Sequence, residues 1–485
     1  MTGSTGSMTP RPAFQVRNSL FIGGRWASAE GKSVTQVLDS ATEEPVGEVH
    51  TASGTQLDAA VQAARNALPE WAAKSPAERA QYLGQLQRQL VSRADAMAAL
   101  IAAEVGTPLR LAKSIQVGLP IAVLGSYVEL LGEFDFQETI GNSVVLREPV
   151  GVVAAITPWN YPLHQAVAKV AAALAAGSTI VLKPSTLAQL NVFALADAVE
   201  AAELPPGVFN LVAGPGSEIG DAMARHHGID MISFTGSTAA GIQVAKTAAE
   251  SLKRLSLELG GKSANILLDD ADFQRAVSAG VNNAFLNSGQ TCSAWTRMLV
   301  PVSHVADVLD LARAAAQRLT LGDPFDESTR LGPLVSSGQM GQVGRFVESG
   351  IAEGATLVLG GPERPSSLER GFYFQPTIFS DVVPQMQIAQ EEIFGPVLAI
   401  MPYVNETEAI QIANATGYGL AGAVWSADPE HATRIAREMR TGQVDINGGR
   451  FNPLAPFGGF GKSGYGRELG RFGLEEFLEL KALQY

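Results

Sequence analysis

The sequence predicts an α/β protein built around a doubly wound, mostly parallel sheet. From residue 151 to residue 261, short and continuously apolar runs alternate with longer amphipathic segments of helical periodicity. The same alternation starts again after Asn265. Continuous apolar strands are typical of parallel sheets that are buried on both faces, and helices between them supply the crossovers. Ligands of such sheets bind at the carboxyl ends of the strands, so the residues that follow each strand are the candidates for chemistry.

The chain before this alternation has three parts. The polar stretch 1–18 lacks the apolar core of a signal peptide, and we expect it to be disordered or foreign to the fold. Residues 20–50 contain the short apolar runs and turns of β-strands. Residues 55–115 have helical periodicity, and Gly106 followed by Thr and Pro closes that block.

Local signals bound the elements of the alternation itself. Pro162 suits the first turn of a helix and Gly177 suits the left-handed residue after its last turn. The expected strands are 151–158, 178–184, 208–214, 230–236, 254–261, 265–270, 297–302, 355–361, 374–382, 397–404 and 421–426. The expected helices are 162–177, 187–202, 217–228, 238–252, 272–287 and 304–318. Residues 134–148 predict a hairpin around Gly141, which the tail 472–485 can join as an edge.

Composition excludes several classes of protein. The chain has 485 residues, of which 46% are hydrophobic and 17% charged, so two or three ordinary globular domains are expected. The net charge of −13 and the lack of a Lys/Arg block argue against nucleic-acid binding. The most apolar segment, 167–182, is too short and too interrupted to span a membrane. A single cysteine cannot form an intrachain disulfide, so a cytoplasmic location is expected.

That cysteine, Cys292, is the first candidate for chemistry. A lone cysteine is more often a small buried hydrophobe than a nucleophile. Here Gly289 and the small polar neighbours Thr291 and Ser293 describe a loop rather than an apolar stripe. A reactive thiol needs a lowered pKa and a donor for the oxyanion that it creates. No histidine lies nearby in the sequence, so a Cys-His hydrolase has no sequence support.

Two polar residues follow expected strands. Glu258 alternates with leucines at a strand end, where it is either a solvated surface residue or a general base. The glycines after it indicate a backbone packed close to a ligand or to another segment. Asn160 follows the strand 151–158, where it is either a turn residue or an amide donor to an oxyanion.

The glycine-rich stretches exclude some nucleotide sites. The stretch from Gly214 to Gly220 departs from the dinucleotide fingerprint, because its third glycine is one place late. The FTGS turn, 234–237, leads into a helix and offers N-terminal amides to a phosphate. GGKS and FGKS lack the first glycine of a P-loop, since Ser256 and Pro456 stand there. No metal site is expected either.

Seven motifs in one order carry a family resemblance. From about Leu20 to the C-terminus the chain resembles the aldehyde dehydrogenase superfamily. The motifs are TPWNYP at 157–162, LKPS at 182–185, FTGS at 234–237, LELGGKS at 257–263, GQTC at 289–292, EEIFGPV at 391–397 and PFGGFGKSGYGRE at 456–468.

The resemblance implies the chemistry. Cys292 would attack the aldehyde carbon, and the Asn160 side chain with the Cys292 backbone N–H would hold the oxyanion. Hydride would pass to NAD or NADP, leaving a thioester that water activated by Glu258 would release as a carboxylic acid. Lys169 and Glu468 would support Glu258 in proton transfer. Because CoA-acylating branches of the family lack a carboxylate at the position of Glu258, hydrolytic release is the expected reaction.

The resemblance also implies a cofactor cleft and a substrate tunnel. Lys183 and Glu392 would contact ribose, Phe394 the nicotinamide, Ser237 the pyrophosphate, and Trp159 would line the cleft. Further cofactor residues are expected at Ile156, Thr157, Pro158, Ser185, Thr186, Gly216, Gly220, Phe234, Thr235, Gly236, Leu259 and Gly260. Substrate residues are expected at Tyr161, Gln165, Thr291, Ser293, Phe451 and Phe457.

The family fold implies three units. We expect a cofactor-binding domain at 1–126 and 151–261, a catalytic domain at 262–461, and a small β-extension for oligomerisation at 127–150 and 462–485. A homodimer or homotetramer follows from that extension.

Two departures bear on specificity. NAD-preferring relatives often carry Glu where this chain has Thr186, so we expect NADP to be tolerated. Relatives that act on succinic semialdehyde often present arginines where this chain has Ala168 and Leu286, so we expect an uncharged aliphatic, terpenoid or aromatic aldehyde. Arg450 leaves a semialdehyde open as the alternative. Two other functions are considered. The first is a catalytically idle relative, which the presence of Cys292, Glu258 and Asn160 disfavours. The second is a cysteine hydrolase or acyltransferase without nicotinamide, which the cofactor motifs disfavour.

Overall fold

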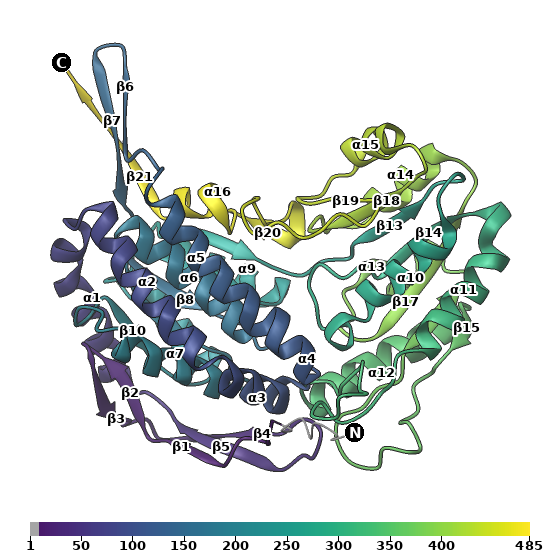
Figure 1. Cartoon of the computed structure of the whole chain (residues 1–485), viewed down its shortest axis with the longest axis horizontal. Coiled ribbons are helices and arrows are strands. Elements are labelled where there is room, and N and C mark those ends of the chain that lie inside the picture. The colour runs from purple at the N-terminus through teal and green to yellow at the C-terminus, as the bar shows by residue number, and fades with distance from the viewer. Residues whose placement is uncertain (1–8) are drawn as a thin grey trace, which may run out of the picture.

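The computed structural model describes residues 9–485, which form two lobes, each built on a large sheet (Figure 1). The sheet of the first lobe has the strand order β20-β12-β11-β8-β9-β10-β2-β3. Its five central strands are parallel, whereas β20 on one side and the β2–β3 hairpin on the other are antiparallel. The strands are β2 (Ser19–Ile22), β3 (Arg25–Ser28), β8 (Val152–Ile156), β9 (Thr179–Lys183), β10 (Phe209–Leu211), β11 (Met231–Thr235), β12 (Arg254–Glu258) and β20 (Gly464–Tyr465).

Helices cover both faces of this sheet, which explains the continuous apolar strands. All residues of β8 and β9 are buried, and a sheet sandwiched between helices leaves no face for polar side chains. The helices of this lobe are α1 (Gly54–Ala72), α2 (Pro76–Ser92), α3 (Ala94–Val105), α6 (Pro162–Ala176), α7 (Leu190–Ala201), α8 (Asp221–Arg225) and α9 (Thr238–Ala249). Gly177 follows α6 in the left-handed conformation, as its position in the sequence predicts.

The second lobe is also built on a mostly parallel sheet with helices. Its sheet has the order β15-β16-β17-β14-β13-β18-β19, and all pairs except β15–β16 are parallel. Separate apolar cores lie against the sheet. The strands are β13 (Ala264–Leu267), β14 (Arg297–Pro301), β15 (Thr356–Leu359), β16 (Thr377–Ser380), β17 (Val397–Tyr403), β18 (Gly422–Trp425) and β19 (Asp445–Ile446). The helices are α10 (Phe273–Ala284), α11 (Val305–Gln317), α12 (Ser337–Ala352), α13 (Gln387–Gln390), α14 (Glu406–Asn414) and α15 (Pro429–Glu438). The doubly wound α/β class is therefore confirmed.

A three-stranded antiparallel sheet projects from the first lobe (Figure 1). It consists of β6 (Gln137–Ile140), β7 (Ser143–Pro149) and β21 (Leu478–Gln484), with the C-terminal strand paired along all of β7. Gly141 turns the hairpin with φ 59°. Residues 464–477, in contrast, stay with the first lobe: β20 pairs with β12, and α16 (Gly470–Glu475) packs on the core through Leu474.

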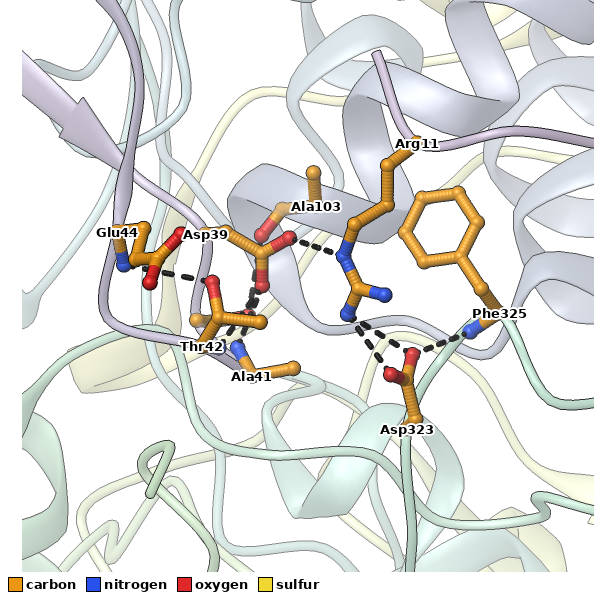
Figure 2. Close-up of polar contacts among 9 residues, drawn as sticks. Arg11, Asp39, Ala41, Thr42, Glu44, Ala103, Asp323 and Phe325 are labelled. Atoms are coloured by element: carbon orange, nitrogen blue, oxygen red, sulfur yellow. Dashed lines mark hydrogen bonds and ion pairs between the residues drawn. The ribbon is translucent and has the colours of Figure 1, made fainter.

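The N-terminal segment differs from expectation after the undescribed residues 1–8. Strand β1 (Gln15–Arg17) joins β5 (Pro45–His50) and β4 (Val34–Leu38) in a small sheet, so the expectation of disorder is wrong for this part. Arg11 explains the order, because its guanidinium donates to buried Asp39 at 2.9 Å and to Asp323 at 2.9 and 3.0 Å (Figure 2). The group also lies 4.7 Å from the centre of the Phe325 ring. The segment around Arg11 is thereby tied to both lobes.

One helical run has the length and hydropathy of a membrane span. It covers Leu109–Leu130 with a mean hydropathy of 1.3 in its most apolar window. The run consists of α4 (Leu109–Leu111), a π-helical segment (Ala112–Gly118) and α5 (Leu119–Leu130). Val123, Leu124 and Tyr127 are buried in the core of the first lobe. This run therefore packs as part of the fold.

Candidate active site

Cys292 lies in a loop whose backbone is held in an unusual conformation. The helix expected at 272–287 ends earlier, at Ala284, because Asn287 and Ser288 adopt positive φ angles of 53° and 57° in the short 3-10 segment Leu286–Gly289. At Gly289, a Cβ atom would lie 2.0 Å from the Gly395 carbonyl oxygen, so only glycine fits this close approach. The loop thereby brings Cys292, partly exposed, to the junction of the two lobes.

Buried side chains fix this loop against the residue that follows β8. The Asn160 amide Nδ2 donates to the Gln290 carbonyl oxygen at 2.9 Å. The Asn160 carbonyl oxygen accepts from Gln116 Nε2 at 2.8 Å and from Asn287 Nδ2 at 3.1 Å. Asn160 therefore has one amide hydrogen engaged and one left to donate. The geometry places an amide donor beside the thiol.

Two cavities meet at Cys292. The first, which we call the strand-end cleft, is lined by Pro158, Trp159, Asn160, Gln165, Thr235, Gly236, Ser237, Leu259, Gly260, Cys292, Gln339, Gln342, Glu392 and Phe394. The second, which we call the aromatic pocket, is lined by Ser114, Ile115, Gly118, Leu119, Ala122, Tyr161, His164, Gln165, Asn283, Leu286, Thr291, Cys292, Ser293, Trp295, Ala421, Gln443, Asp445, Phe451 and Phe457. A group held in one cavity and a molecule held in the other would both reach the thiol.

The strand-end cleft has the features of a dinucleotide site. It opens at the carboxyl ends of β8, β11 and β12, as expected for a parallel sheet. Ser237 is the N-cap of α9, so the amide groups of that helix face the cleft and suit a phosphate. Trp159 and Phe394 meet edge to face with ring centres 5.3 Å apart, and Phe394 holds a positive φ of 59°. Glu392 accepts from the Gly261 N–H at 2.9 Å, and burial raises the pKa of its carboxyl to about 7.

The other expected cofactor residues lie next to the cleft rather than on its wall. A Cβ at Gly220 would lie 3.9 Å from the Lys183 side chain and 4.0 Å from Ile156, so these three residues are neighbours at the ends of their elements. Burial lowers the pKa of Lys183 to about 8. Thr157, Ser185, Thr186, Gly216 and Phe234 also lie at or just after the ends of β8, β9, β10 and β11. Together, the amides, the acidic residue and the flat aromatic walls suit NAD or NADP.

The aromatic pocket collects every residue expected to touch substrate. Tyr161, Gln165, Thr291, Ser293, Phe451 and Phe457 all line it. The Tyr161 hydroxyl is 2.8 Å from the Thr291 hydroxyl, which joins the two sides of the wall. Leu286 lines the pocket, but Ala168 is buried in α6 and Arg450 does not line it.

Burial opposes ionisation of the thiol and of its expected base. Burial, then the negative charges of Glu392 and Glu258, raise the pKa of Cys292, whereas the Ser293 N–H lowers it. Glu258 is 2% exposed, and neither of its carboxylate oxygens has a hydrogen-bond partner in the described part of the chain. Burial, then the charge of Glu468, raise the pKa of Glu258 well above its ordinary value. Both groups therefore hold protons more tightly than in water.

Glu258 lines neither cavity, but it lies near enough to Cys292 for its charge to raise the pKa of the thiol. It ends β12, and a Cβ at Gly458 would lie 2.6 Å from Glu258 Oε1, so glycine leaves the room that this carboxylate occupies. Lys169 and Glu468, 299 residues apart, form a buried ion pair beside it. The structure thus brings the five expected catalytic residues into one cluster.

Several lining residues were missed by the sequence reasoning. Gln339 and Gln342 belong to α12, where no motif marks them, and Trp295 follows Cys292 by three places without a recognisable signal. Asp445 and His164 reach the pocket only through the packing of the lobes. Among the residues that the structure describes, no group of three or more His, Cys, Asp or Glu side chains is placed to hold a metal ion.

Comparison with known proteins decides the family. The aldehyde dehydrogenase family profile matches residues 26–483. This chain belongs to the aldehyde dehydrogenase family. The enzyme is accordingly an NAD(P)-dependent aldehyde dehydrogenase, and solved relatives contain NAD+.

Individual relatives of this aldehyde dehydrogenase cover nearly its whole length. The 3-succinoylsemialdehyde-pyridine dehydrogenase of a Pseudomonas species is 48% identical over 96% of this chain and 97% of its own. The solved aldehyde dehydrogenase C of Pseudomonas syringae, a variant in complex with NAD+ and octanal, is 47% identical over 96% of each chain, with a TM-score of 0.95. The Mycobacterium tuberculosis aldehyde dehydrogenase with NAD+ is 42% identical over 98% of this chain and 99% of its own, also with a TM-score of 0.95.

Proposed function

We propose that this enzyme oxidises an uncharged aliphatic, terpenoid or aromatic aldehyde to the carboxylic acid through a thioester on Cys292. The observation that carries the proposal is the meeting of the two cavities at the Cys292 thiol. NAD+ or NADP+ held by the residues of the strand-end cleft would supply the hydride acceptor. The aldehyde enters through the aromatic pocket, and Cys292 Sγ, having lost its proton to solvent, attacks the carbonyl carbon. Loss of hydride from that carbon to the cofactor would then leave the thioester.

Asn160 holds the charge that this attack creates on the aldehyde oxygen. Its free amide hydrogen and the backbone N–H of Cys292 are the proposed donors. The hydrogen bonds that the Asn160 backbone and side chain already make with Gln116, Asn287 and Gln290 fix the amide before the aldehyde arrives. A donor fixed in this way needs no reorganisation in the transition state.

Glu258 is the proposed base for hydrolysis of the thioester. Within the described residues its buried carboxylate has no hydrogen-bond partner to compete for a proton, and its raised pKa makes it a stronger base than an ordinary carboxylate. Water gives a proton to Glu258 and adds to the thioester carbon, and the Cys292–acyl bond then breaks to release the acid. The Lys169–Glu468 pair next to Glu258 positions it and takes part in returning the proton to solvent.

The wall of the aromatic pocket supports an uncharged substrate. Aromatic and aliphatic side chains dominate it, and none of the described residues that line it is a lysine or arginine able to hold a distal carboxylate. The octanal complex of the Pseudomonas syringae relative supports an aliphatic aldehyde. The name of the Pseudomonas relative fits the semialdehyde alternative only weakly.

An aldehyde panel tests the proposed substrate class. We expect kcat/KM for hexanal or benzaldehyde to exceed that for succinic semialdehyde, measured as NAD(P)H absorbance at 340 nm. A clear preference for succinic semialdehyde would refute the proposal.

NADP use is the second prediction for this site. Because Thr186 is neutral and Lys183 lies nearby, we expect NAD to be preferred over NADP by less than roughly a thousandfold in kcat/KM, or about 4 kcal/mol. Thr186→Glu should lower kcat/KM for NADP by about tenfold or more relative to NAD, because its charge repels the 2′-phosphate. Thr186→Gln, which adds the same bulk without charge, is the control. Equal effects of the two variants would contradict the electrostatic reason.

Location and assembly are also proposals. We propose a cytoplasmic enzyme that forms a homodimer or homotetramer through the projecting sheet of β6, β7 and β21, as an extension to the cofactor-binding and catalytic domains. The exposed Ile140 and Leu480 on that sheet support an interface there.

A further inference from the structure

The aromatic pocket contains one carboxylate. Among its described lining residues, Asp445 is the only aspartate or glutamate, and none is a lysine or arginine. Asp445 begins β19, the edge strand of the second sheet, and pairs with Ala423 of β18. Its sequence context carries none of the motifs of the family resemblance. A lone acid in a pocket for uncharged molecules needs a reason, because burying a charge opposes folding.

Asp445 has hydrogen bonding but no neutralising partner. Gln443 Nε2 donates to Asp445 Oδ1 at 2.9 Å, and no lysine, arginine or histidine in the described residues forms an ion pair with it. Partial burial raises the pKa of Asp445 from 3.8, and the Gln443 hydrogen bond lowers it. The charge of this lining residue is therefore not neutralised by an ion pair within the described residues.

The rest of the wall adds no positive charge. Among the described residues of the wall, His164 is the one side chain that could carry a positive charge. Burial lowers its pKa to about 4, so it stays neutral near pH 7. Phe451 and Phe457, with ring centres 6.3 Å apart, meet edge to face and add no charge to the wall. The electrostatic character of the pocket therefore has one sign.

We propose that Asp445 selects substrates by charge: it rejects aldehydes with an anionic tail and admits neutral and cationic ones. This inference rests on the proposed function, in which the aromatic pocket receives the aldehyde. An anionic tail would enter beside Asp445 with no cation to offset the repulsion, and like charges in a partly desolvated pocket interact more strongly than in water. A cationic tail would gain the same interaction with opposite sign.

Three aldehydes of similar length test the proposal. They are succinic semialdehyde, its neutral methyl ester, and 4-trimethylammoniobutanal, whose positive charge is fixed. In Asp445→Asn we expect kcat/KM for succinic semialdehyde, relative to the methyl ester, to rise at least about tenfold. The value of kcat/KM for the cationic aldehyde, relative to that for the methyl ester, should fall by a similar factor. The methyl ester itself should change by less than about threefold, which also reports that the variant is folded.

Controls separate the pocket charge from other effects. Asp269→Asn removes an acid whose side chain is 77% exposed, outside the pocket, and both ratios should stay unchanged. Asp445→Ser is the second variant if the asparagine enzyme loses activity on the methyl ester, and it should shift both ratios in the same directions. Unchanged ratios in active Asp445 variants overturn the role of Asp445 alone. A native enzyme that prefers succinic semialdehyde to its methyl ester overturns both this inference and the proposed substrate class.

Discussion

Replacing Cys292 with alanine is expected to lower kcat/KM for aldehyde oxidation at least roughly ten-thousandfold, because the variant lacks the only atom that can carry the acyl group. The neighbouring hydroxyl of Thr291 cannot substitute, since it is already engaged with the Leu286 carbonyl oxygen at 3.1 Å and with Tyr161. Activity is measured at 340 nm, and NAD binding by quenching of tryptophan fluorescence. We expect binding to persist, because Cys292 is one of many residues on the cleft.

The rate of alkylation of Cys292 is expected to depend on pH. Burial and nearby carboxylates raise the pKa of Cys292, and the thiolate is the reactive form, so the rate of modification by iodoacetamide should rise with pH into the alkaline range. Because the chain has a single cysteine, the added mass reports this site alone. Ser367→Ala, at an exposed position that lines neither cavity, is the control variant and should keep the activity. Residual oxidation above one part in a hundred in Cys292→Ala, or fast alkylation that does not depend on pH, would contradict the proposed nucleophile.

The order of strands and helices could be predicted because it depends on local patterns. The runs that became β8 and β9 are apolar at every position, since helices cover both faces of the sheet. The same reasoning failed for the N-terminal segment, which was expected to be disordered. Its order comes from Arg11, whose partners Asp39 and Asp323 are distant in sequence, and polar composition carries no sign of such a contact.

The site could be predicted only where motifs mark it. Lys169 and Glu468 lie 299 residues apart, and only the family resemblance paired them. Asp445 and Gln339 have no motif, and their place on a cavity wall depends on how β19 and α12 pack. Cys292 shows a different limit of prediction from sequence. A lowered pKa is what a nucleophilic cysteine needs, yet burial and the nearby carboxylates raise the pKa of Cys292, and no local sequence pattern indicates these surroundings.

Glu258→Gln is expected to separate the two halves of the reaction. Glutamine keeps the shape of the side chain but cannot accept a proton, so hydrolysis of the thioester should slow by about 10²- to 10⁴-fold. Hydride transfer precedes hydrolysis, so the first turnover should persist as a burst of NAD(P)H stoichiometric with enzyme. Stopped-flow absorbance at 340 nm resolves the burst, and mass spectrometry should detect the acyl group on Cys292.

The rate of thioester hydrolysis is also expected to depend on pH through Glu258. Because burial and Glu468 raise the pKa of Glu258, the carboxylate fraction grows as pH rises through that raised value. In the native enzyme the hydrolysis rate should rise with pH and then level off, and in Glu258→Gln this rise should vanish. Glu476→Gln is the comparison variant: it should keep the burst and the rise, and the rise should move to lower pH, because the charge of Glu476 contributes to the raised pKa of Glu258. If the burst disappears together with turnover in Glu258→Gln, then Glu258 instead takes the proton of the Cys292 thiol, and its assignment to hydrolysis alone is wrong.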